Sequence, residues 1–168
     1  MSSSASDRSR TAPRLTEDER ARLGSLPGRV DCERVRLHRT AVGGAAGALR
    51  RVVLWVSRGR AVALGNHVFL PGHCADDLAI LAHELTHCGQ YQAWGGWRYF
   101  MRGASAQLRE LAHRALRVGQ SPYRYRLEEG KPFEAYGMEQ QGQIVEDSYR
   151  GDRAALAVSP FRPPGDLA

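Results

Sequence analysis

The chain has 168 residues, of which 42% are hydrophobic, and a formal net charge of +6. A chain of this length can bury a hydrophobic core, so its fold does not need a metal ion for stability. Its 24 basic residues are spread along the sequence, which argues against a specific nucleic-acid partner, and no apolar run approaches the roughly 18 to 20 residues of a membrane span.

The cysteines and the N-terminus bear on the cellular compartment. The three cysteines, Cys32, Cys74 and Cys88, are an odd number and sparse, which argues against a disulfide framework, so we expect reduced thiols. Residues 1–13 are rich in Ser and Arg and lack the apolar core of a secretory signal, which predicts a disordered tail. We expect synthesis in the cytoplasm and, where export occurs, a route that needs no cleaved signal peptide.

The N-terminal half is predicted to form a helix and a small sheet. Thr16 and Glu19 have the spacing of a capping box, so a short helix should follow and end at Gly24. Residues 41–47 are rich in Gly and Ala and indicate a flexible connection. Alternation or β-branched content predicts four strands: residues 34–38, 49–56, 60–64 and 67–70. With a turn at 57–59, these segments predict a mostly antiparallel sheet.

The C-terminal half is predicted to be helical. Asp76 or Asp77 can cap a helix whose apolar residues recur every three or four positions and which ends at residues 95–96. Further helices are expected over residues 105–119 and from Pro132 to about Tyr149. Residues 159–168 contain three prolines and indicate an irregular tail. Residues 14–158 should therefore form one α+β domain, a small antiparallel sheet packed against three to four helices.

The run His83-Glu84-Leu85-Thr86-His87 lies within the first of these helices. A spacing of four residues puts both imidazoles on one helical face, where they can share one metal ion, and zinc accepts imidazole nitrogen readily. Glu84 lies beside the first ligand and would act as general base toward a water activated by zinc. The alternative is an incidental pair of surface histidines. The uninterrupted, capped helix favours a zinc site for peptide-bond hydrolysis.

A third ligand must come from elsewhere in the chain. The candidates are His113 and, on the last predicted helix, Glu134, Glu139 and Glu146. Glu139 is favoured as a mid-helix residue, because the small residues Ala135 and Gly142 would let two helices approach closely. Glu134 would lie in the first helical turn, where carboxylates are common because they interact favourably with the helix N-terminus. Glu146 suits a supporting or surface position, and His113 a solvated helix residue.

Several other residues have both a functional and a structural interpretation. The segment with Tyr123, Arg124, Tyr125 and Arg126 could donate to a developing oxyanion, or could be a loop with buried rings and solvated arginines. Cys88 is most simply a small core residue, although Cys74 and Cys88 could add thiolate ligands. His67 or His73 could hydrogen-bond near the site, and Asp147 could orient a ligand histidine. Trp94 and Trp97 are expected as core or groove aromatics.

Residues 81–87 with 90–92, residues 64–71, Glu139-Gln140-Gln141 and Glu146-Asp147 resemble a bacterial metallopeptidase-like family. This is the family of Vgr-related proteins from type VI secretion loci, which is similar to the core domain of extracellular contractile injection systems. The resemblance covers most of residues 15–150. It implies a minimal gluzincin-like fold, Glu139 as third ligand and secretion-system components as partners. The chain departs from it at Cys88, Gly89 and Gly142, in packing positions.

Two functions from different classes follow. In the first, the protein is a zinc metallopeptidase for a peptide or protein substrate, with ligands His83, His87 and Glu139 and general base Glu84. The strands before the motif would offer an edge for an extended peptide. In the second, it is a catalytically silent zinc-binding accessory or cargo module of a secretion apparatus. A third option, an arginine-rich nucleic-acid binder, would show a steep salt dependence of binding.

Overall fold

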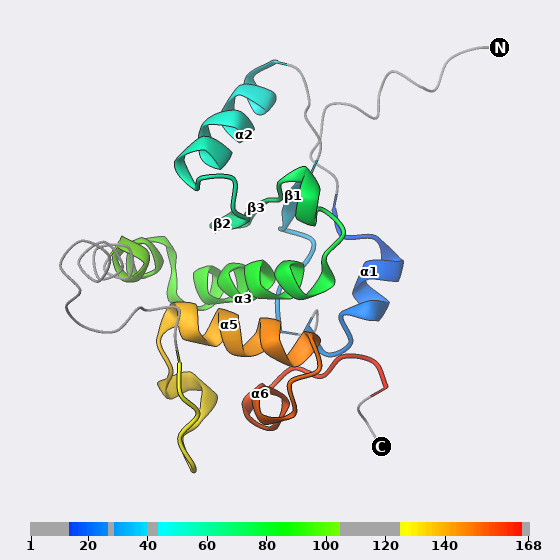
Figure 1. The fold of residues 1–168 in the computed structure, drawn as a ribbon. Coiled ribbons are helices and arrows are strands. Elements are labelled where there is room, and N and C mark those ends of the chain that lie inside the picture. Colours follow the sequence, from blue (N-terminus) through cyan, green and yellow to red (C-terminus); the bar gives the residue numbers. More distant parts are fainter. Residues whose placement is uncertain (1–13, 27–28, 40–43, 105–124, 166–168) are drawn as a thin grey trace.

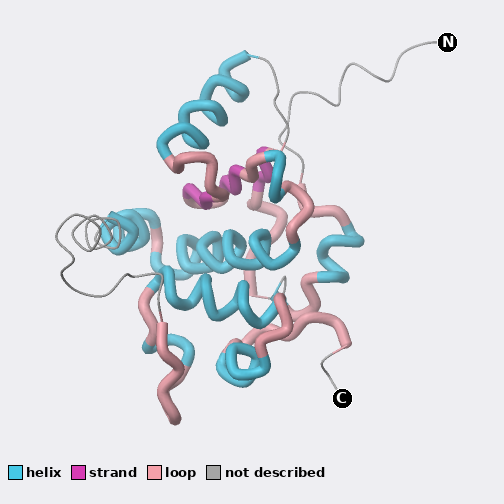
Figure 2. Tube along the Cα trace, in the orientation of Figure 1, coloured by secondary structure: helices cyan, strands magenta, loops and turns pink. Residues whose placement is uncertain are grey.

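The structure is a computed structural model that describes residues 14–26, 29–39, 44–104 and 125–165. This part contains six helices and a three-stranded sheet, which confirms the α+β class (Figures 1 and 2). The α-helices and strands are α1 (Glu17–Arg22), β1 (Arg36–His38), α2 (Gly44–Val56), β2 (Val62–Leu64), β3 (His67–Phe69), α3 (Leu78–Trp94), α5 (Met138–Tyr149) and α6 (Arg153–Val158). Residues 96–104 are also helical. Two short 3-10 helices are η2 (Gly72–Cys74) and η3 (Phe133–Ala135).

The sheet is mixed, with strand order β1-β3-β2. Strands β2 and β3 form the expected antiparallel hairpin, in which Ala63 lies opposite Val68. Strand β1 pairs parallel to β3, with Leu37 opposite Val68, so the expectation of antiparallel pairing is wrong for this strand. Parallel neighbours need a long crossover connection, and α2 lies in that connection. Strand β2 is left at an edge of the sheet, beside α3.

Residues 49–56 were predicted as a strand, and this prediction is wrong because they form most of α2. Leu49, Val52, Val53 and Val56 recur at the three- and four-residue spacing of a helix. This periodicity outweighs the strand preference of β-branched side chains. The helix also includes residues 44–47, which were predicted as part of a flexible connection. In Figure 1 the sheet lies between α2 and α3.

Capping signals predicted α1 and α3 correctly. The Thr16 hydroxyl accepts from the Glu19 backbone N–H at 3.2 Å, and the Glu19 carboxylate accepts from the Thr16 N–H at 2.9 Å. Asp77 caps α3 by accepting from the N–H groups of Ala79 and Ile80 at 3.0 and 3.1 Å. Helix α3 ends at Gly95, whose φ of 78° favours glycine. The helix predicted over residues 105–119 lies outside the described residues, and the helical residues 96–104 were not predicted.

The core lies between the sheet and the α3–α5 pair. Leu81, Leu85 and Cys88 of α3 are buried in it with Val145 of α5 and Val68 of β3. These contacts hold one face of α3 against the sheet and let another face meet α5. As predicted, Cys88 is a core residue.

The C-terminal residues contribute to the core. Helix α6 was not predicted. Residues 159–165 are irregular, as expected, but Phe161 is buried and the Arg162 N–H donates to the Ser25 hydroxyl at 2.7 Å. Within the described ranges, no helix is long and apolar enough to cross a membrane.

Candidate metal centre

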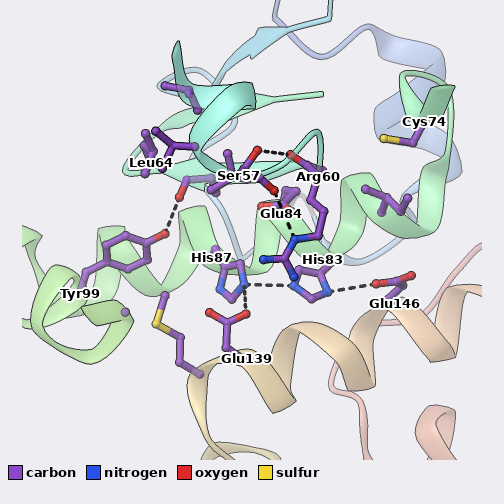
Figure 3. A pocket seen from close by; sticks show the side chains of 18 of the residues that line it. Ser57, Arg60, Leu64, Cys74, His83, Glu84, His87, Tyr99, Glu139 and Glu146 are labelled. Carbon is purple, nitrogen blue, oxygen red and sulfur yellow. Dashed lines mark hydrogen bonds and ion pairs between the residues drawn. The ribbon is translucent and has the colours of Figure 1, made fainter. Parts of the chain in front are cut away.

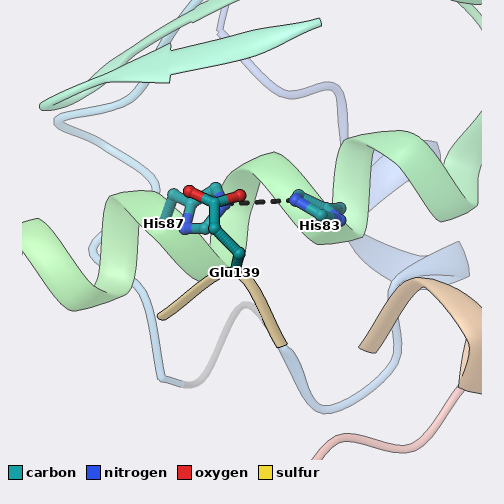
Figure 4. A group of neighbouring side chains, drawn as sticks. All are labelled: His83, His87 and Glu139. Atoms are coloured by element: carbon teal, nitrogen blue, oxygen red, sulfur yellow. Dashed lines mark hydrogen bonds and ion pairs between the residues drawn. The ribbon is translucent and has the colours of Figure 1, made fainter. Parts of the chain in front are cut away.

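Three buried side chains converge between α3 and α5 (Figure 4). His83 and His87 come from α3 and Glu139 from α5, and one potential ligand atom of each lies within 4.8 Å of the others. The two Nε2 atoms are 3.1 Å apart, and His87 Nε2 lies 3.6 Å from Glu139 Oε2. The fold therefore brings together the three residues that the sequence predicted as metal ligands.

Helix α5 can approach His83 because residue 142 is glycine. A Cβ atom on Gly142 would lie 2.8 Å from His83 Nε2, closer than real Cβ contacts. The prediction that Gly142 permits a close helix approach therefore agrees with the structure. A larger side chain at this position would have to displace the imidazole from the cluster.

The start of α5 differs from the prediction. The helix begins at Met138, after Pro132 has opened the short helix η3. Gly137 is the N-cap, and its N–H donates to the Gln140 side chain at 3.0 Å. Glu139 is therefore in the first turn of α5 and not mid-helix, and Ala135 is not on this helix at all. The prediction that Ala135 lets the two helices approach is therefore wrong, since the break at Gly137 sets where α5 begins.

Hydrogen bonds at Nδ1 fix the orientation of His87. Its Nδ1 lies 2.8 Å from Gln90 Oε1, and Gln90 Nε2 donates to Gln141 Oε1 at 2.9 Å. Gln141 Nε2 in turn donates to the Tyr136 carbonyl at 2.9 Å. Since this chain of donors makes Gln90 Oε1 an acceptor, Nδ1 of His87 carries the proton. The Nε2 lone pair then points into the cluster.

His83 is oriented in the same way by a carboxylate. Its Nδ1 lies 3.1 Å from Glu146 Oε2, and the other oxygen of Glu146 accepts from Arg150. The second Nε2 lone pair therefore also points into the cluster. When neither Nε2 carries a proton, two lone pairs 3.1 Å apart repel unless a metal ion lies between them, so the deprotonated pair can hold a metal ion. Two imidazole nitrogens and one carboxylate oxygen form a suitable donor set for a divalent transition metal.

Glu84 is the buried carboxylate beside this cluster. Its side chain is 5% exposed, and its Oε2 has no hydrogen-bond partner among the described residues. Burial raises the pKa of Glu84, while the charges of His83 and His87 and a backbone hydrogen bond from Ala63 of β2 oppose this effect. An unpartnered buried oxygen is costly and calls for a polar ligand. Glu84 is therefore available to a water or a substrate.

The charges within the cluster influence one another strongly. Burial alone would raise the pKa of Glu139, but the hydrogen bond and charge of His87 and the charges of His83 and Arg60 lower it. Burial would lower the pKa of His87, but Glu139 outweighs it and raises this pKa to about 9. In the metal-free protein the cluster therefore holds Glu139 as a carboxylate and favours a protonated His87, and a bound metal ion would replace the proton on Nε2.

The cluster forms one side of a cavity of about 750 Å³ (Figure 3). The polar side chains that line it include Ser57, Arg60, His73, His83, Glu84, His87, Glu139 and Glu146. Apolar side chains from three elements line the rest: Val52, Val53 and Val56 of α2, Leu64 of β2, and Phe100 of the helix at 96–104. Val56 is 68% exposed and Phe100 51% exposed, so these walls are open to a ligand. Cavities of this size and polarity commonly bind small molecules or peptide segments.

The other acidic candidates lie outside the cluster. Glu134 is exposed on η3, and only its backbone carbonyl approaches the site, as an acceptor from Gln141. Glu146 has the supporting position that the sequence suggested. Asp147 accepts from the Tyr125 hydroxyl and from Gln143 and contacts neither histidine. His113 lies outside the described residues.

Of the remaining candidate residues, some line the cavity and others do not. Tyr123 and Arg124 lie outside the described residues, Tyr125 is held by Asp147, and Arg126 is exposed away from the cavity. His73 and Cys74 line the cavity, whereas His67 stacks on His38 at a centroid distance of 5.3 Å and does not. Trp97 is 78% exposed, and Arg102 lies 4.3 Å above the Trp94 ring.

Three residues at the site were not predicted as functional: Arg60, Gln90 and Gln141. A weak signal was present for the two glutamines, since Gln90 lies three residues after His87 and Gln141 two after Glu139. Nothing in the sequence pointed to Arg60.

Removing the carboxylate that orients His83 should weaken metal binding. We expect Glu146→Ala to lower the metal affinity about 10- to 100-fold, because the imidazole loses the acceptor that fixes its Nδ1 proton and its orientation. Competition with a chromogenic chelator measures this affinity. The neighbouring variant Asp147→Asn is the control, and an equal effect of both variants would show that Glu146 has no specific role.

Comparison with known proteins relates the first half of the chain to secretion systems. Residues 14–95 match the family model of the eCIS core domain. This range includes the sheet and α3, and therefore His83, Glu84 and His87, but it ends before Glu139.

One curated protein adds to this relationship. The type VI secretion system spike protein VgrG2b of Pseudomonas aeruginosa is 39% identical over 70 residues, which are 42% of this chain and 6% of that protein. The chain thus spans a small part of that relative. No solved structure matches the chain. The two matches support a relationship to eCIS and Vgr-related proteins.

Proposed function

We propose that this protein is a zinc-dependent peptidase. The observation that carries the proposal is the pair of imidazoles of His83 and His87, each held by a hydrogen bond at Nδ1, with their Nε2 atoms 3.1 Å apart beside Glu139. Buried next to these imidazoles is Glu84, a carboxylate with an unpartnered oxygen. Two histidines, one carboxylate and an adjacent acid are the set of residues that hydrolytic zinc sites use.

Each residue of the site has a separate role in the proposed reaction. His83, His87 and Glu139 would hold the ion, and bound zinc supplies Lewis acidity that lowers the pKa of water to near 7. Glu84 accepts the proton of the attacking water and delivers it to the amide nitrogen of the leaving group. Its position beside the two histidines, in the wall of the cavity, places Glu84 for this transfer. Gln90 and Glu146 keep the two imidazoles in position.

The substrate that the cavity suits is an extended peptide. Strand β2 is at the edge of the sheet and, through Ala63, lies directly beside Glu84. A peptide added along this side would place one of its carbonyl groups near the cluster. Exposed apolar side chains on α2, β2 and the helix at 96–104 would cover its side chains.

Metal analysis and a hydrolysis assay on the purified chain test the proposal. We expect one zinc ion per chain by mass spectrometry, cleavage of fluorescently labelled casein, and loss of cleavage on chelation that added zinc restores. Absence of zinc after remetallation would refute both the metal site and the activity. Zinc without cleavage would favour the second function.

That second function is a zinc-binding accessory or cargo module without catalysis. The matches to the eCIS core domain and to a type VI spike protein favour an association with a secretion apparatus, whose components would be the partners. Delivery by such an apparatus would not need a cleaved signal peptide. A zinc site with a purely structural role has no use for the unpartnered oxygen of Glu84. For this reason the peptidase is the better-supported function.

A further inference from the structure

A cationic side chain lines the cavity together with the cluster. Arg60 lies two residues before β2 and is exposed at the cavity surface. In Figure 3 its side chain runs from the loop toward the two imidazoles. Arg60 and the clustered residues His83, His87 and Glu139 line the same cavity. Arg60 therefore brings a positive charge and several N–H donors to the place where a substrate carbonyl would lie.

The backbone before β2 holds this arginine in place. Arg58 and Gly59 both have left-handed conformations, with φ of 57° and 73°, and make a tight turn. The Ser57 hydroxyl donates to the Arg60 carbonyl at 2.8 Å, and the Arg60 N–H donates to the Ser57 carbonyl at 3.3 Å. Arg60 Nε also lies 3.4 Å from the Ser57 carbonyl, which orients the start of the guanidinium. The turn thus aims the side chain into the cavity.

Two tyrosine hydroxyls near the site donate to other acceptors. The Tyr99 hydroxyl donates to the Ala63 carbonyl at 2.9 Å, and burial raises the pKa of this phenol. The Tyr125 hydroxyl is bound to Asp147 and does not line the cavity. Among the described residues that line the cavity, Arg60 is the one with a guanidinium, whose planar set of donors suits an anionic oxygen.

We propose that Arg60 is a catalytic residue that donates a hydrogen bond to the carbonyl oxygen of the scissile peptide as it becomes negatively charged. This inference rests on the proposed peptidase function. In the first step the water oxygen bonds to the carbonyl carbon, the π electron pair of the C=O bond moves to the carbonyl oxygen, and Glu84 takes a proton from the water. In the second step that electron pair re-forms the C=O bond and the C–N bond breaks. The electrons of the C–N bond stay on the nitrogen, which receives the proton from Glu84. Arg60 stabilises the charged stage between these two halves.

Steady-state kinetics with labelled peptides test this role. We expect Arg60→Ala to lower kcat about 10²- to 10³-fold, as loss of an oxyanion donor does in other hydrolases, while KM changes about twofold or less. Arg60→Lys should recover part of kcat, because lysine keeps the charge but not the planar fork. Arg51→Ala is the matched control, since Arg51 is exposed on α2 and does not line the cavity.

Binding of a peptide phosphonate gives a readout that does not depend on turnover. Its anionic tetrahedral oxygens mimic the charged stage, so Arg60→Ala should weaken phosphonate binding about 100-fold and change the binding of the matching neutral peptide little. Equal phosphonate affinity in both proteins would overturn the proposal. A loss of zinc in Arg60→Ala would also overturn it, because Arg60 would then act by positioning Glu139. An inactive wild type would overturn the peptidase function and with it this role of Arg60, whereas an active wild type with unchanged phosphonate affinity in Arg60→Ala would overturn the role of Arg60 alone.

Discussion

Glu84→Gln is expected to keep its zinc and to lose hydrolysis by about 10²- to 10⁴-fold, the range that a general acid–base contributes. Glutamine has nearly the same shape but cannot accept the proton of the attacking water. Since Glu84 is not one of the three clustered ligand residues, the metal content should stay at the wild-type value. Zinc content by mass spectrometry and kcat with a labelled protein substrate check both halves of the prediction.

The same variant is also informative about stability. The wild-type carboxylate is buried with an unpartnered oxygen, so a neutral amide should leave the melting temperature of the metal-free protein equal or higher. Glu134→Gln, at an exposed position, serves as the control. Full hydrolysis by Glu84→Gln would contradict the assigned role. A variant that unfolds would contradict the view that Glu84 serves chemistry and not packing.

Glu139→Ala should abolish stable metal binding. It removes one of three ligands, so we expect the affinity to fall by more than about 100-fold, beyond the effect of losing a supporting residue. The pKa of His87 should also fall, because the hydrogen bond and charge of Glu139 are what raise it above the usual value. Metal titration by calorimetry measures the first effect, and NMR titration of the metal-free imidazole measures the second.

The matched control for this ligand is Glu134→Ala. Both residues are glutamates near the start of α5, but Glu134 is exposed on η3 while Glu139 lies against His87. Zinc retained in Glu134→Ala and lost in Glu139→Ala would establish the ligand set. The opposite pattern would mean that Glu134 and not Glu139 is the third ligand, and that η3 refolds on metal binding.

Local signals made part of this fold predictable. The caps at Thr16 and Asp77 and the glycine at 95 act over one helical turn, so their effects can be read without tertiary structure. The i, i+4 geometry of His83 and His87 is local in the same sense. The strand prediction for residues 49–56 was wrong because their helical periodicity outweighs the strand preference of their β-branched side chains. The start of α5 was missed because Gly137, and not Pro132, is its N-cap.

Residues that matter only through tertiary contacts could not be predicted. Arg60 belongs to the site because a turn before β2 directs it into a cavity formed by several elements that are separate in sequence. Gln90 and Gln141 support His87 through a hydrogen bond that crosses from α3 to α5. The register between these helices depends on the close approach of Gly142 to His83. This contact is known only once the two helices are packed together, so the sequence pattern does not reveal it.

The position of the ligands on two helices far apart in sequence also makes a bound ion a cross-link. His87 and Glu139 enclose the whole segment from the end of α3 to the start of α5, so an ion held by both would close a long loop. Closing a loop removes entropy from the unfolded chain, and each doubling of loop length changes this term by only about 0.6 kcal/mol. An ion present at 1,000 times its dissociation constant stabilises the folded state by about 4 kcal/mol. The enclosed segment could therefore lengthen or shorten among homologues with little change in how firmly the two helices are joined.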